Sequence, residues 1–383
     1  MIKYKKLITD IIKMVEEDGD RLKSLSAKCT NDTEYWTNYD LSELNKSLVK
    51  LVKVKIPKNR KPLGKILLIT SYNEPFILSV MPALQALIMG NEVYFKPSSK
   101  NYDFVRYFWI KSGLIKKYKL KLSILPISNN GPKLLNSLSS YDSVNFYGSN
   151  EVSKKIRLEC AKQNVRFVAE VESADFQILF NKKLNKKYFK DLFSQSFSHS
   201  GQICQRIQGV YVHKSMYKLF KTNLLNEFRN FIESAEYKKH ISDSIDYPKL
   251  SKKFILDNKS SMPKDVMSAE SGYPKIIFEP KYSSQVVLDA YFLPVIWVVV
   301  FEDKNDLIKK ISKRPYAQGV NISSDSKPFI YWVINETRYS RYTINSNHTS
   351  TSRDTGWGGI WPTGSNGYVN WLDQFSYHYK IID

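Results

Sequence analysis

Cysteine is scarce in this chain of 383 residues, which contains only Cys29, Cys160 and Cys204. Three cysteines so far apart do not form a disulfide framework, so we expect a reducing compartment, the cytoplasm. Long apolar runs are also missing: the most apolar stretch, 294–301, is far too short to span a bilayer and fits a buried strand. The N-terminal sequence MIKYKKLITDIIKMVEED has neither the apolar core nor the cleavage site of a signal peptide. The sequence therefore predicts no membrane segment.

Acidic residues are few relative to basic ones, 37 against 58, which gives a net charge of +21. A positive field attracts nucleic acid, anionic lipid or phosphorylated ligands. The basic residues, however, are mostly lysines scattered along the chain beside many Asn, Ile and Tyr, a pattern typical of an AT-rich genome. We therefore expect neither a nucleic-acid nor a membrane partner, since an anionic cofactor needs only a local patch.

From residue 65 onward, apolar strands alternate with amphipathic helices, which predicts an α/β fold with a doubly wound parallel sheet. Such sheets bind ligands at the carboxyl ends of their strands. The predicted strands are 65–71, 92–96, 120–126, 143–147 and 165–169, and the predicted helices are 75–89, 102–114 and 151–163. The rhythm restarts after about residue 172, with helices at 187–197 and 216–234 and strands at 208–213, 275–278 and 295–301. The hydrophobic fraction of 42% is enough for two cored domains.

Four other segments are predicted from their spacing and composition. Residues 4–27 have the pattern of one amphipathic helix, and 48–58 alternate and then break, like an edge strand that runs into a loop. Residues 236–275 are polar and predict a surface excursion, and the Gly- and Ser-rich tail from Thr351 predicts mostly loop.

Cys204 lies in SHSGQICQRIQGVYVH, residues 198–213, between a predicted helix and a predicted strand. Such a loop can expose the sulfur and place backbone N–H groups beside it, where they stabilise a thiolate or an oxyanion. The alternative is a small buried hydrophobe, which is what most lone cysteines are.

Three further candidates end predicted strands. Asn73 in TSYNEPF offers an amide donor for an oxyanion, or it merely caps the next helix. Lys96 in YFKPSS suits a ribose or phosphate, or it is one lysine among many. In FVAEVESAD, Glu170 and Glu172 offer a carboxylate, or they form a solvated pair of surface acids.

The order of these stretches resembles the aldehyde dehydrogenase family. SYNEP, FKPSS, FYGSNEV, the acid after a strand and GQIC correspond to that family's PWNFP, LKPSE, FTGSTEVG, LELGG and GQxC. FLPV (292–295) resembles its FGPV, and GWGG (356–359) its PFGG. The 34 residues that separate Glu170 from Cys204 match the family's interval, and the resemblance covers roughly residues 5–380.

The resemblance implies an NAD(P)-dependent oxidation of an aldehyde to a carboxylic acid, through a cysteine thiohemiacetal and a thioester. It assigns Cys204 as nucleophile, Glu170 as general base, and Asn73 with the Cys204 N–H as oxyanion hole. It implies no metal. The remaining implied roles are cofactor binding by Lys96, Ser99, Gly148, Ser149 and Phe292, and lining of the substrate entrance by Trp357.

Departures from the family pattern gather at the cofactor positions. Ser99 replaces an acid that binds the adenosine ribose, and Ala290 replaces the acid that holds the nicotinamide ribose. Ser153, Glu172 and Ser173 stand where the family has glycine. Two alternatives therefore stay open: an acyl-CoA reductase that forms an aldehyde, and a non-catalytic relative that only binds.

The resemblance also implies an organisation into domains. We expect a cofactor-binding domain over 1–172, a catalytic α/β domain over 173–362, and a tail over 363–383 that returns to the first domain. Because family tails add a strand to a partner's sheet, a homo-oligomer is expected.

Overall fold

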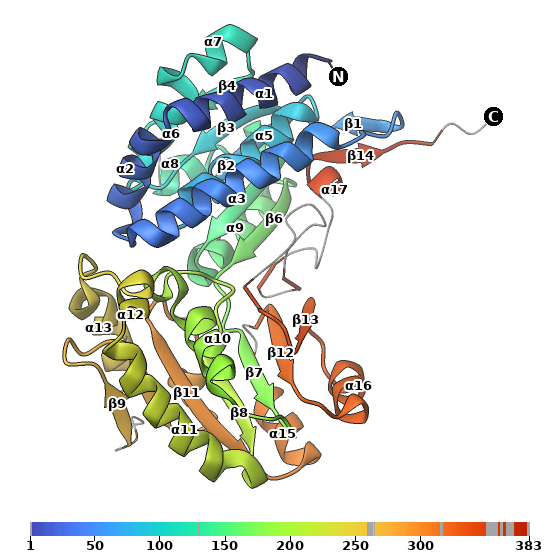
Figure 1. Cartoon of the computed structure of the whole chain (residues 1–383). Helices are drawn as coiled ribbons and strands as arrows, with labels where there is room; N and C mark the ends of the chain where they lie inside the picture. Colours follow the sequence, from blue (N-terminus) through green and yellow to red (C-terminus); the bar gives the residue numbers. More distant parts are fainter. Residues whose placement is uncertain are drawn as a thin grey trace. The chain divides into compact units, whose positions relative to one another are not determined.

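The computed structural model describes residues 2–128, 131–258, 263, 265–314, 317–349, 359–360, 363–364 and 371–380. The chain divides into two compact units: unit 1 includes Met1–Val171 and Gly364–Asp383, and unit 2 includes Glu172–Thr351. Each unit has its own sheet (Figure 1). Each also has its own apolar core. Among the described residues, no helix combines the length and apolarity needed to cross a bilayer.

Unit 1 contains a five-stranded parallel sheet in the order β4-β3-β2-β5-β6. Its strands are β2 (Lys65–Ile69), β3 (Glu92–Lys96), β4 (Leu122–Ile124), β5 (Ser143–Gly148) and β6 (Arg166–Val171). The chain adds β3 and β4 on one side of β2, then crosses to add β5 and β6 on the other. The doubly wound prediction is confirmed, and the winding reverses between β2 and β5, where such sheets bind ligands.

The helices of unit 1 differ from the prediction at the N-terminus. They are α1 (Ile2–Glu17), α2 (Gly19–Thr30), α3 (Glu34–Lys53), α4 (Pro75–Leu78), α5 (Met81–Ile88), α6 (Tyr102–Arg106), the π-helical η1 (Tyr107–Lys111), α7 (Leu114–Tyr118), α8 (Gly131–Leu135), the 3₁₀ turn η2 (Leu138–Ser140) and α9 (Asn150–Lys162). The single helix predicted over 4–27 is two helices that meet at Asp18 and Gly19. Glycine is a poor helix former, so the break falls there.

The strand predicted over 48–58 is wrong, because α3 continues to Lys53. Leu48 and Leu51 are buried whereas Val49 is exposed, which is helical spacing rather than strand alternation. The strand of this region is β1 (Arg60–Pro62), which pairs antiparallel with β14 (Ser376–His378) of the tail. The short helix α17 (Trp371–Phe375) precedes β14 and packs in the core of unit 1.

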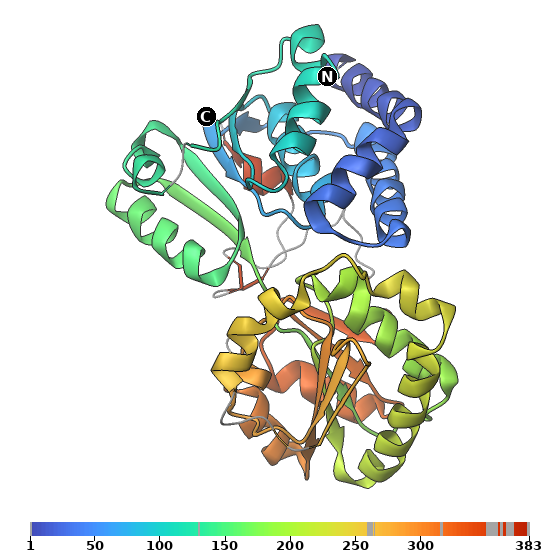
Figure 2. The same cartoon turned by 90° about the vertical axis from the view of Figure 1, so that its left-hand side faces the viewer.

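Unit 2 contains a seven-stranded sheet in the order β13-β12-β7-β8-β11-β10-β9, in which β9 alone runs antiparallel to its neighbour. Its strands are β7 (Phe176–Leu179), β8 (Gly209–His213), β9 (Val266–Ser268), β10 (Lys275–Phe278), β11 (Val295–Phe301), β12 (Gly319–Ser323) and β13 (Arg341–Ile344). Its helices are α10 (Lys186–Phe197), the 3₁₀ turn η3 (Ser198–Gly201), α11 (Lys214–Ile232), α12 (Ala235–His240), α13 (Tyr247–Asn258), α14 (Gln285–Leu288), α15 (Lys304–Ile311) and α16 (Lys327–Glu336). Figure 2 shows helices on both sides of this sheet.

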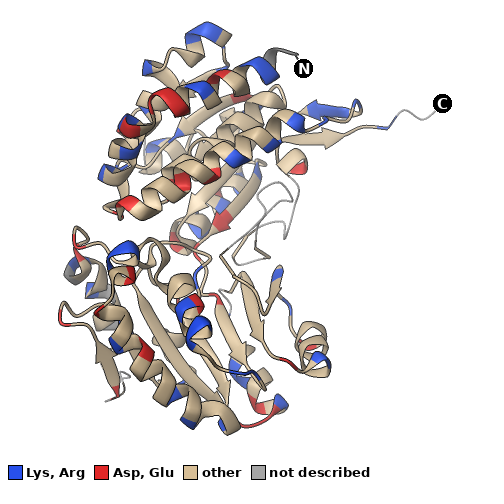
Figure 3. Cartoon of the chain, in the orientation of Figure 1, with Lys and Arg blue, Asp and Glu red and all other residues tan. Residues whose placement is uncertain are grey.

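Residues 236–275 are more than a surface excursion, because α13 and β9 lie within them and α12 overlaps their start. Ile241, Tyr247 and Phe254 are buried and join the core of unit 2. Few but well-spaced apolar residues therefore anchor a segment whose composition is mainly polar. In Figure 3, lysines and arginines are spread over both units among acidic residues.

Candidate active site

Asn73 lies in the bend between β2 and α4 of unit 1, and its side chain is buried. Ser71 Oγ donates a hydrogen bond of 2.6 Å to Asn73 Oδ1. This bond occupies the acceptor end of the amide and directs its donor end away from Ser71. The capping alternative is wrong, because the N-cap residue of α4 is Glu74, in a left-handed conformation.

Lys96 ends β3, beside the end of β2, and is only 8% exposed. Its Nζ donates to the carbonyl of Pro97 at 3.2 Å, and no acid among the described residues pairs with it. Burial lowers the pKa of Lys96. A buried ammonium with a single backbone acceptor has capacity for further acceptors, as ribose hydroxyls or a phosphate provide.

Ser99 lies on the surface three residues after Lys96. The next residue, Lys100, places its ammonium 4.0 Å from the centre of the Tyr72 ring, in the bend that carries Asn73. Two lysines thus lie at the carboxyl ends of β2 and β3, where the fold predicts a ligand site.

Gly148 ends β5 and Ser149 caps α9, accepting a hydrogen bond from the N–H of Val152 at 3.4 Å. A helix N-terminus carries backbone donors and a partial positive charge, which suit a phosphate. Together with Lys96, this strand-to-helix turn fits the pyrophosphate and ribose of a dinucleotide.

Glu170 lies near the carboxyl end of β6, paired in register with Tyr147, and its side chain is partly buried. It also forms an isolated antiparallel bridge with Gly364 of the tail. Burial raises the pKa of Tyr147, whose hydroxyl accepts a bond of 2.7 Å from Gln374 Nε2. The tail therefore packs beside the strand that carries the candidate base.

Cys204 lies in unit 2, in a turn between η3 and β8. Three consecutive residues before it, His199, Ser200 and Gly201, have positive φ angles of 51°, 56° and 83°. Left-handed conformations cost a non-glycine residue roughly 1–3 kcal/mol, so the surrounding contacts must enforce them. Ser200 supplies two: its Oγ donates to the carbonyl of His240 at 3.2 Å and accepts from the N–H of Ser242 at 3.0 Å.

The three cysteines differ in exposure. Cys204 is partly exposed, whereas Cys29 and Cys160 are buried. Burial raises the pKa of Cys29 to about 12 and that of Cys160 to about 12. The candidate nucleophile is therefore the cysteine that solvent reaches best.

The turn that carries Cys204 is bonded to the segment 291–295, which contains the half-buried Phe292. Arg206 Nη2 donates to the carbonyl of Tyr291 at 2.7 Å, and Gln208 Oε1 accepts from the N–H of Tyr291 at 3.3 Å. The sequence did not identify Arg206 and Gln208, because their importance depends on a contact with residues more than 80 positions away.

A buried charged cluster crosses the sheet of unit 2 and was also not predicted. Asp175 accepts bonds from Arg341 Nη2 at 3.0 Å and from the backbone N–H of Gln318 and Gly319 at 2.8 and 2.9 Å. Although burial raises the pKa of Asp175, the bond from His348 and the charge of Arg341 outweigh it and hold the pKa below its usual value. The cluster thus buries an ionised carboxylate with its charge compensated.

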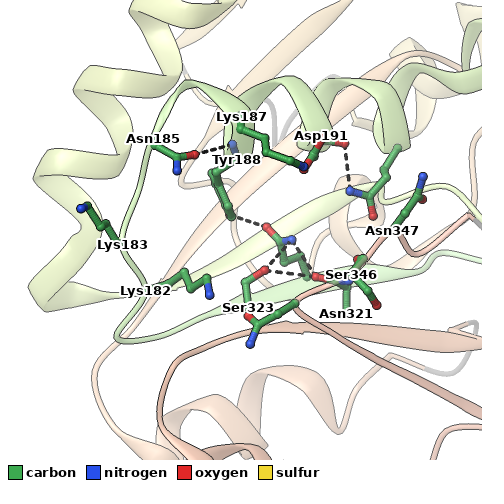
Figure 4. A pocket seen from close by; sticks show the side chains of 13 residues that line it. Lys182, Lys183, Asn185, Lys187, Tyr188, Asp191, Asn321, Ser323, Ser346 and Asn347 are labelled. Carbon is green, nitrogen blue, oxygen red and sulfur yellow. Dashed lines mark hydrogen bonds and ion pairs between the residues drawn. The ribbon is translucent and has the colours of Figure 1, made fainter.

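A pocket of about 450 Å³ in unit 2 lies among α10, β7, β12 and residues 345–347 (Figure 4). Gln177, which lines it, donates to Asn321 at 2.7 Å, while Lys182 is paired with Asp325 and Lys187 with Asp191. These polar groups bind one another, and none of the sequence-predicted site residues lines the pocket. It is therefore separate from the candidate active-site residues.

The structure describes the candidate residues in two sets. Asn73, Lys96, Ser99, Gly148, Ser149 and Glu170 belong to unit 1, and Cys204 and Phe292 belong to unit 2. The residues of unit 1 lie at or just after the carboxyl ends of four neighbouring strands, β3, β2, β5 and β6. Trp357, the predicted entrance residue, lies outside the described residues.

Comparison with known proteins gives matches along almost the whole chain. The model of the aldehyde dehydrogenase family matches residues 27–379. A 4,4'-diapolycopene-4,4'-dial dehydrogenase of Cytobacillus firmus is 23% identical, over 85% of this chain and 72% of its own length. The fatty aldehyde dehydrogenase HFD1 of Saccharomyces cerevisiae is 27% identical, over 80% of this chain and 60% of its own length.

Solved structures agree on the fold. Aldehyde dehydrogenase 21 of Physcomitrella patens superposes with a TM-score of 0.83 at 14% identity, covering 98% of this chain and 84% of that one. An NAD-dependent aldehyde dehydrogenase of Sinorhizobium meliloti gives a TM-score of 0.82 at 16% identity, covering 98% and 81%. The chain belongs to the aldehyde dehydrogenase family, and it is an oxidoreductase of that type.

Proposed function

We propose that the chain oxidises an aldehyde to a carboxylic acid with Cys204 as the covalent nucleophile. One observation carries the assignment: Cys204 is the partly exposed cysteine, and it follows three left-handed residues in a turn tied to the segment of Phe292. Strain that surrounding contacts enforce is typical of active sites. Covalent capture divides one difficult step into two easier ones.

In the first half-reaction, the Cys204 thiolate attacks the aldehyde carbon and forms a thiohemiacetal. The donor end of Asn73, turned away from Ser71, and the Cys204 N–H stabilise the oxyanion. NAD or NADP, when bound, would supply the hydride acceptor. Loss of the hydride leaves a thioester on Cys204, which water then hydrolyses.

Glu170 is proposed as the base that removes a proton from this water. It lies near the end of β6 and is partly exposed. A base that activates water disfavours the acyl-CoA reductase alternative, because an aldehyde-forming reductase must protect its thioester from hydrolysis.

The cofactor residues are proposed by position. Lys96 and Ser99 would bind the adenosine ribose, and Gly148 with Ser149 would hold the pyrophosphate at the start of α9. Phe292 would pack beside the nicotinamide. Unit 1 would thus be the cofactor-binding domain and unit 2 the catalytic domain, with the tail from residue 363 serving the first.

We also propose a homo-oligomer. β1 and β14 form a two-stranded sheet with no further partner strand among the described residues, and such a ribbon alone is only marginally stable. A second copy would complete it. Light scattering at micromolar concentration tests this, and a clean monomer would contradict it.

We propose the cytoplasm as the compartment, because cysteines without disulfide bonds are typical of a reducing environment.

The function is tested by following reduced cofactor with a panel of aliphatic and aromatic aldehydes, for the wild type and for Cys204→Ser. We expect turnover by the wild type and none by the variant, with circular dichroism showing both folded. Repeating the assay in reverse with an acyl-CoA and reduced cofactor tests the alternative. Turnover by Cys204→Ser at the wild-type rate would contradict the mechanism.

A further inference from the structure

We propose that Arg206 is a positioning residue, which holds Phe292 at a fixed place relative to Cys204. The inference rests on the proposed function, in which Cys204 carries the substrate and Phe292 packs beside the nicotinamide. Hydride leaves the carbon bound to Cys204, so the rate depends on how these two residues are aligned.

The Arg206 guanidinium reaches the Phe292 segment at two points. Nη2 donates to the carbonyl of Tyr291 at 2.7 Å, and Nη1 donates to the carbonyl of Val295 at 3.1 Å. These two carbonyls flank the stretch 292–294. Nη1 also lies 3.5 Å from the carbonyl of Ser196, near the end of α10. One side chain therefore joins the end of α10 and the nucleophile turn to both ends of the segment.

Gln208 reinforces this clamp. Its Oε1 accepts from the N–H of Tyr291 at 3.3 Å, and its Nε2 donates to the carbonyl of Ser173 at 2.6 Å. Both backbone groups of Tyr291 are thus held by side chains that follow Cys204 by two and four residues. A backbone held at its donor and at its acceptor cannot rotate freely, so Phe292 next to it is restrained.

Gly201 fixes the same segment from the other side of Cys204 in the sequence. A Cβ on Gly201 would lie 2.3 Å from the carbonyl carbon of Leu293 and 2.4 Å from the nitrogen of Pro294. The two backbones are therefore in direct contact. In the sequence, Cys204 is thus preceded by Gly201, whose backbone contacts the segment, and followed by Arg206 and Gln208, whose side chains bond to it.

The chemistry of Arg206 fits a clamp better than a space-filling role. The side chain is 1% exposed, burial lowers its pKa to about 9, and no acid among the described residues pairs with it. Burying an unpaired charge is costly, and an apolar side chain of similar length would fill the space without that cost. A planar fork that reaches several carbonyls is what arginine alone provides.

Arg314 is a matched control. It is also buried in unit 2, and it donates to the carbonyls of Val287 and Ala174, neither of which belongs to the segment 291–295. Arg206→Met and Arg314→Met should both lower thermal stability. Only Arg206→Met should slow single-turnover formation of reduced cofactor, by about 100-fold, because small misalignments of reacting groups cost that much.

Two readouts without turnover accompany the rates. In cofactor-free Arg206→Met, hydrogen exchange of a peptide covering residues 289–296 should accelerate, while Cys204 alkylation should stay within about threefold of wild type. In Arg314→Met, that peptide should exchange as in wild type. Unchanged exchange at 289–296 in Arg206→Met would overturn the clamp.

Arg206→Lys covers the case in which Arg206→Met does not fold. It keeps the charge but cannot reach two carbonyls with a fork, so hydride transfer should fall by about tenfold. A wild-type rate in Arg206→Lys, or an equal loss in Arg314→Met, would reduce Arg206 to a structural role. If the wild type reduces no cofactor with any aldehyde, the proposed function fails, and the exchange measurement still decides the clamp.

Discussion

The imidazole of His348 is bonded to Asp175, with Nε2 2.8 Å from Oδ2, and both side chains are fully buried. Burial and the neighbouring charge of Arg341 lower the pKa of His348 to about 4. His348 is therefore neutral at pH 7. Because the ionised Asp175 can only accept, Nε2 carries the proton and donates to Asp175, and Nδ1 accepts a hydrogen bond from Thr343 Oγ1 at 2.7 Å. The carboxylate of Asp175 carries the charge.

This pair makes the stability of unit 2 depend on pH. The unfolded chain protonates His348 below pH 6.5, whereas the folded chain does so only near pH 4, so stability falls as the pH is lowered through that window. We expect a loss of up to about 3 kcal/mol from this residue in urea titrations. His348→Gln should flatten the dependence.

His240 provides the comparison, because burial lowers its pKa to about 4 as well. His240→Gln should remove its own share of the pH dependence and leave that of His348. A slope between pH 6.5 and 4 that is unchanged in both variants would show that neither histidine is buried in its neutral form.

Iodoacetamide should alkylate Cys204 before Cys29 or Cys160. Cys204 is partly exposed, and the pKa values of the other two thiols are raised to about 12 by burial, so little thiolate forms on them. Peptide mass spectrometry over time gives the order. Equal labelling of the three cysteines under native conditions would remove the distinction that supports the nucleophile.

Glu170→Gln should slow hydrolysis of the thioester more than hydride transfer, since a base is needed only in the second half-reaction. A burst of reduced cofactor should then appear or grow in stopped-flow experiments. Glu172→Gln is the matched control, two residues away and also partly buried. If Glu172→Gln gives the burst and Glu170→Gln does not, the roles of the two acids are exchanged.

NADP should bind more tightly than NAD. Ser99 replaces an acid that would repel a 2′-phosphate, and Lys96 and Lys100 supply positive charge beside it. A charge-assisted bond to phosphate contributes about 1.5–3 kcal/mol, a preference of about tenfold or more. Tryptophan fluorescence titrations with both cofactors measure it, and Ser99→Glu should reverse the order. Equal affinities in the wild type would refute the preference.

Gly201→Ala should destabilise unit 2 and abolish turnover. The new Cβ would overlap the backbone of Leu293 and Pro294, and backbone atoms cannot give way as a flexible side chain can. We expect a cost of about 3 kcal/mol or more, against about 1 kcal/mol for Gly272→Ala, where φ is +86° but nothing lies within 4 Å. Similar costs for the two would argue against the close contact.

The strands were predictable from the sequence because buried parallel strands are continuous apolar runs. β11 occupies the run predicted over 295–301, and β8 the stretch predicted over 208–213 to within a residue. The error at 48–58 arose because Val52, Val54 and Ile56 alternate with lysines over a short window, whereas Leu48 and Leu51 have helical spacing. Only the longer pattern, with Leu44, identifies α3.

The chemistry of the site was predictable only where it is local. Cys204, Asn73 and Lys96 are marked by their positions beside strands. Arg206 is hydrogen-bonded to Tyr291, and Asp175 to His348. These partners are far apart in the sequence, so a local sequence pattern does not reveal the bonds. Long-range hydrogen bonds between buried polar groups form only after the sheet has assembled, so propensity and periodicity carry no information about them.

The pairing of β1 with β14 has a consequence for how the protein is made. Arg60 bonds to Asp373, and Asn91 donates to the carbonyl of Phe375, so unit 1 needs residues near both ends of the chain. During synthesis, residues 1–171 emerge early yet must wait for their last helix and strand. The described strands of unit 2 all precede residue 345, so its sheet can close on the ribosome first. Until residues 371–375 have emerged, the apolar surface of unit 1 that Trp371 and Phe375 cover remains exposed.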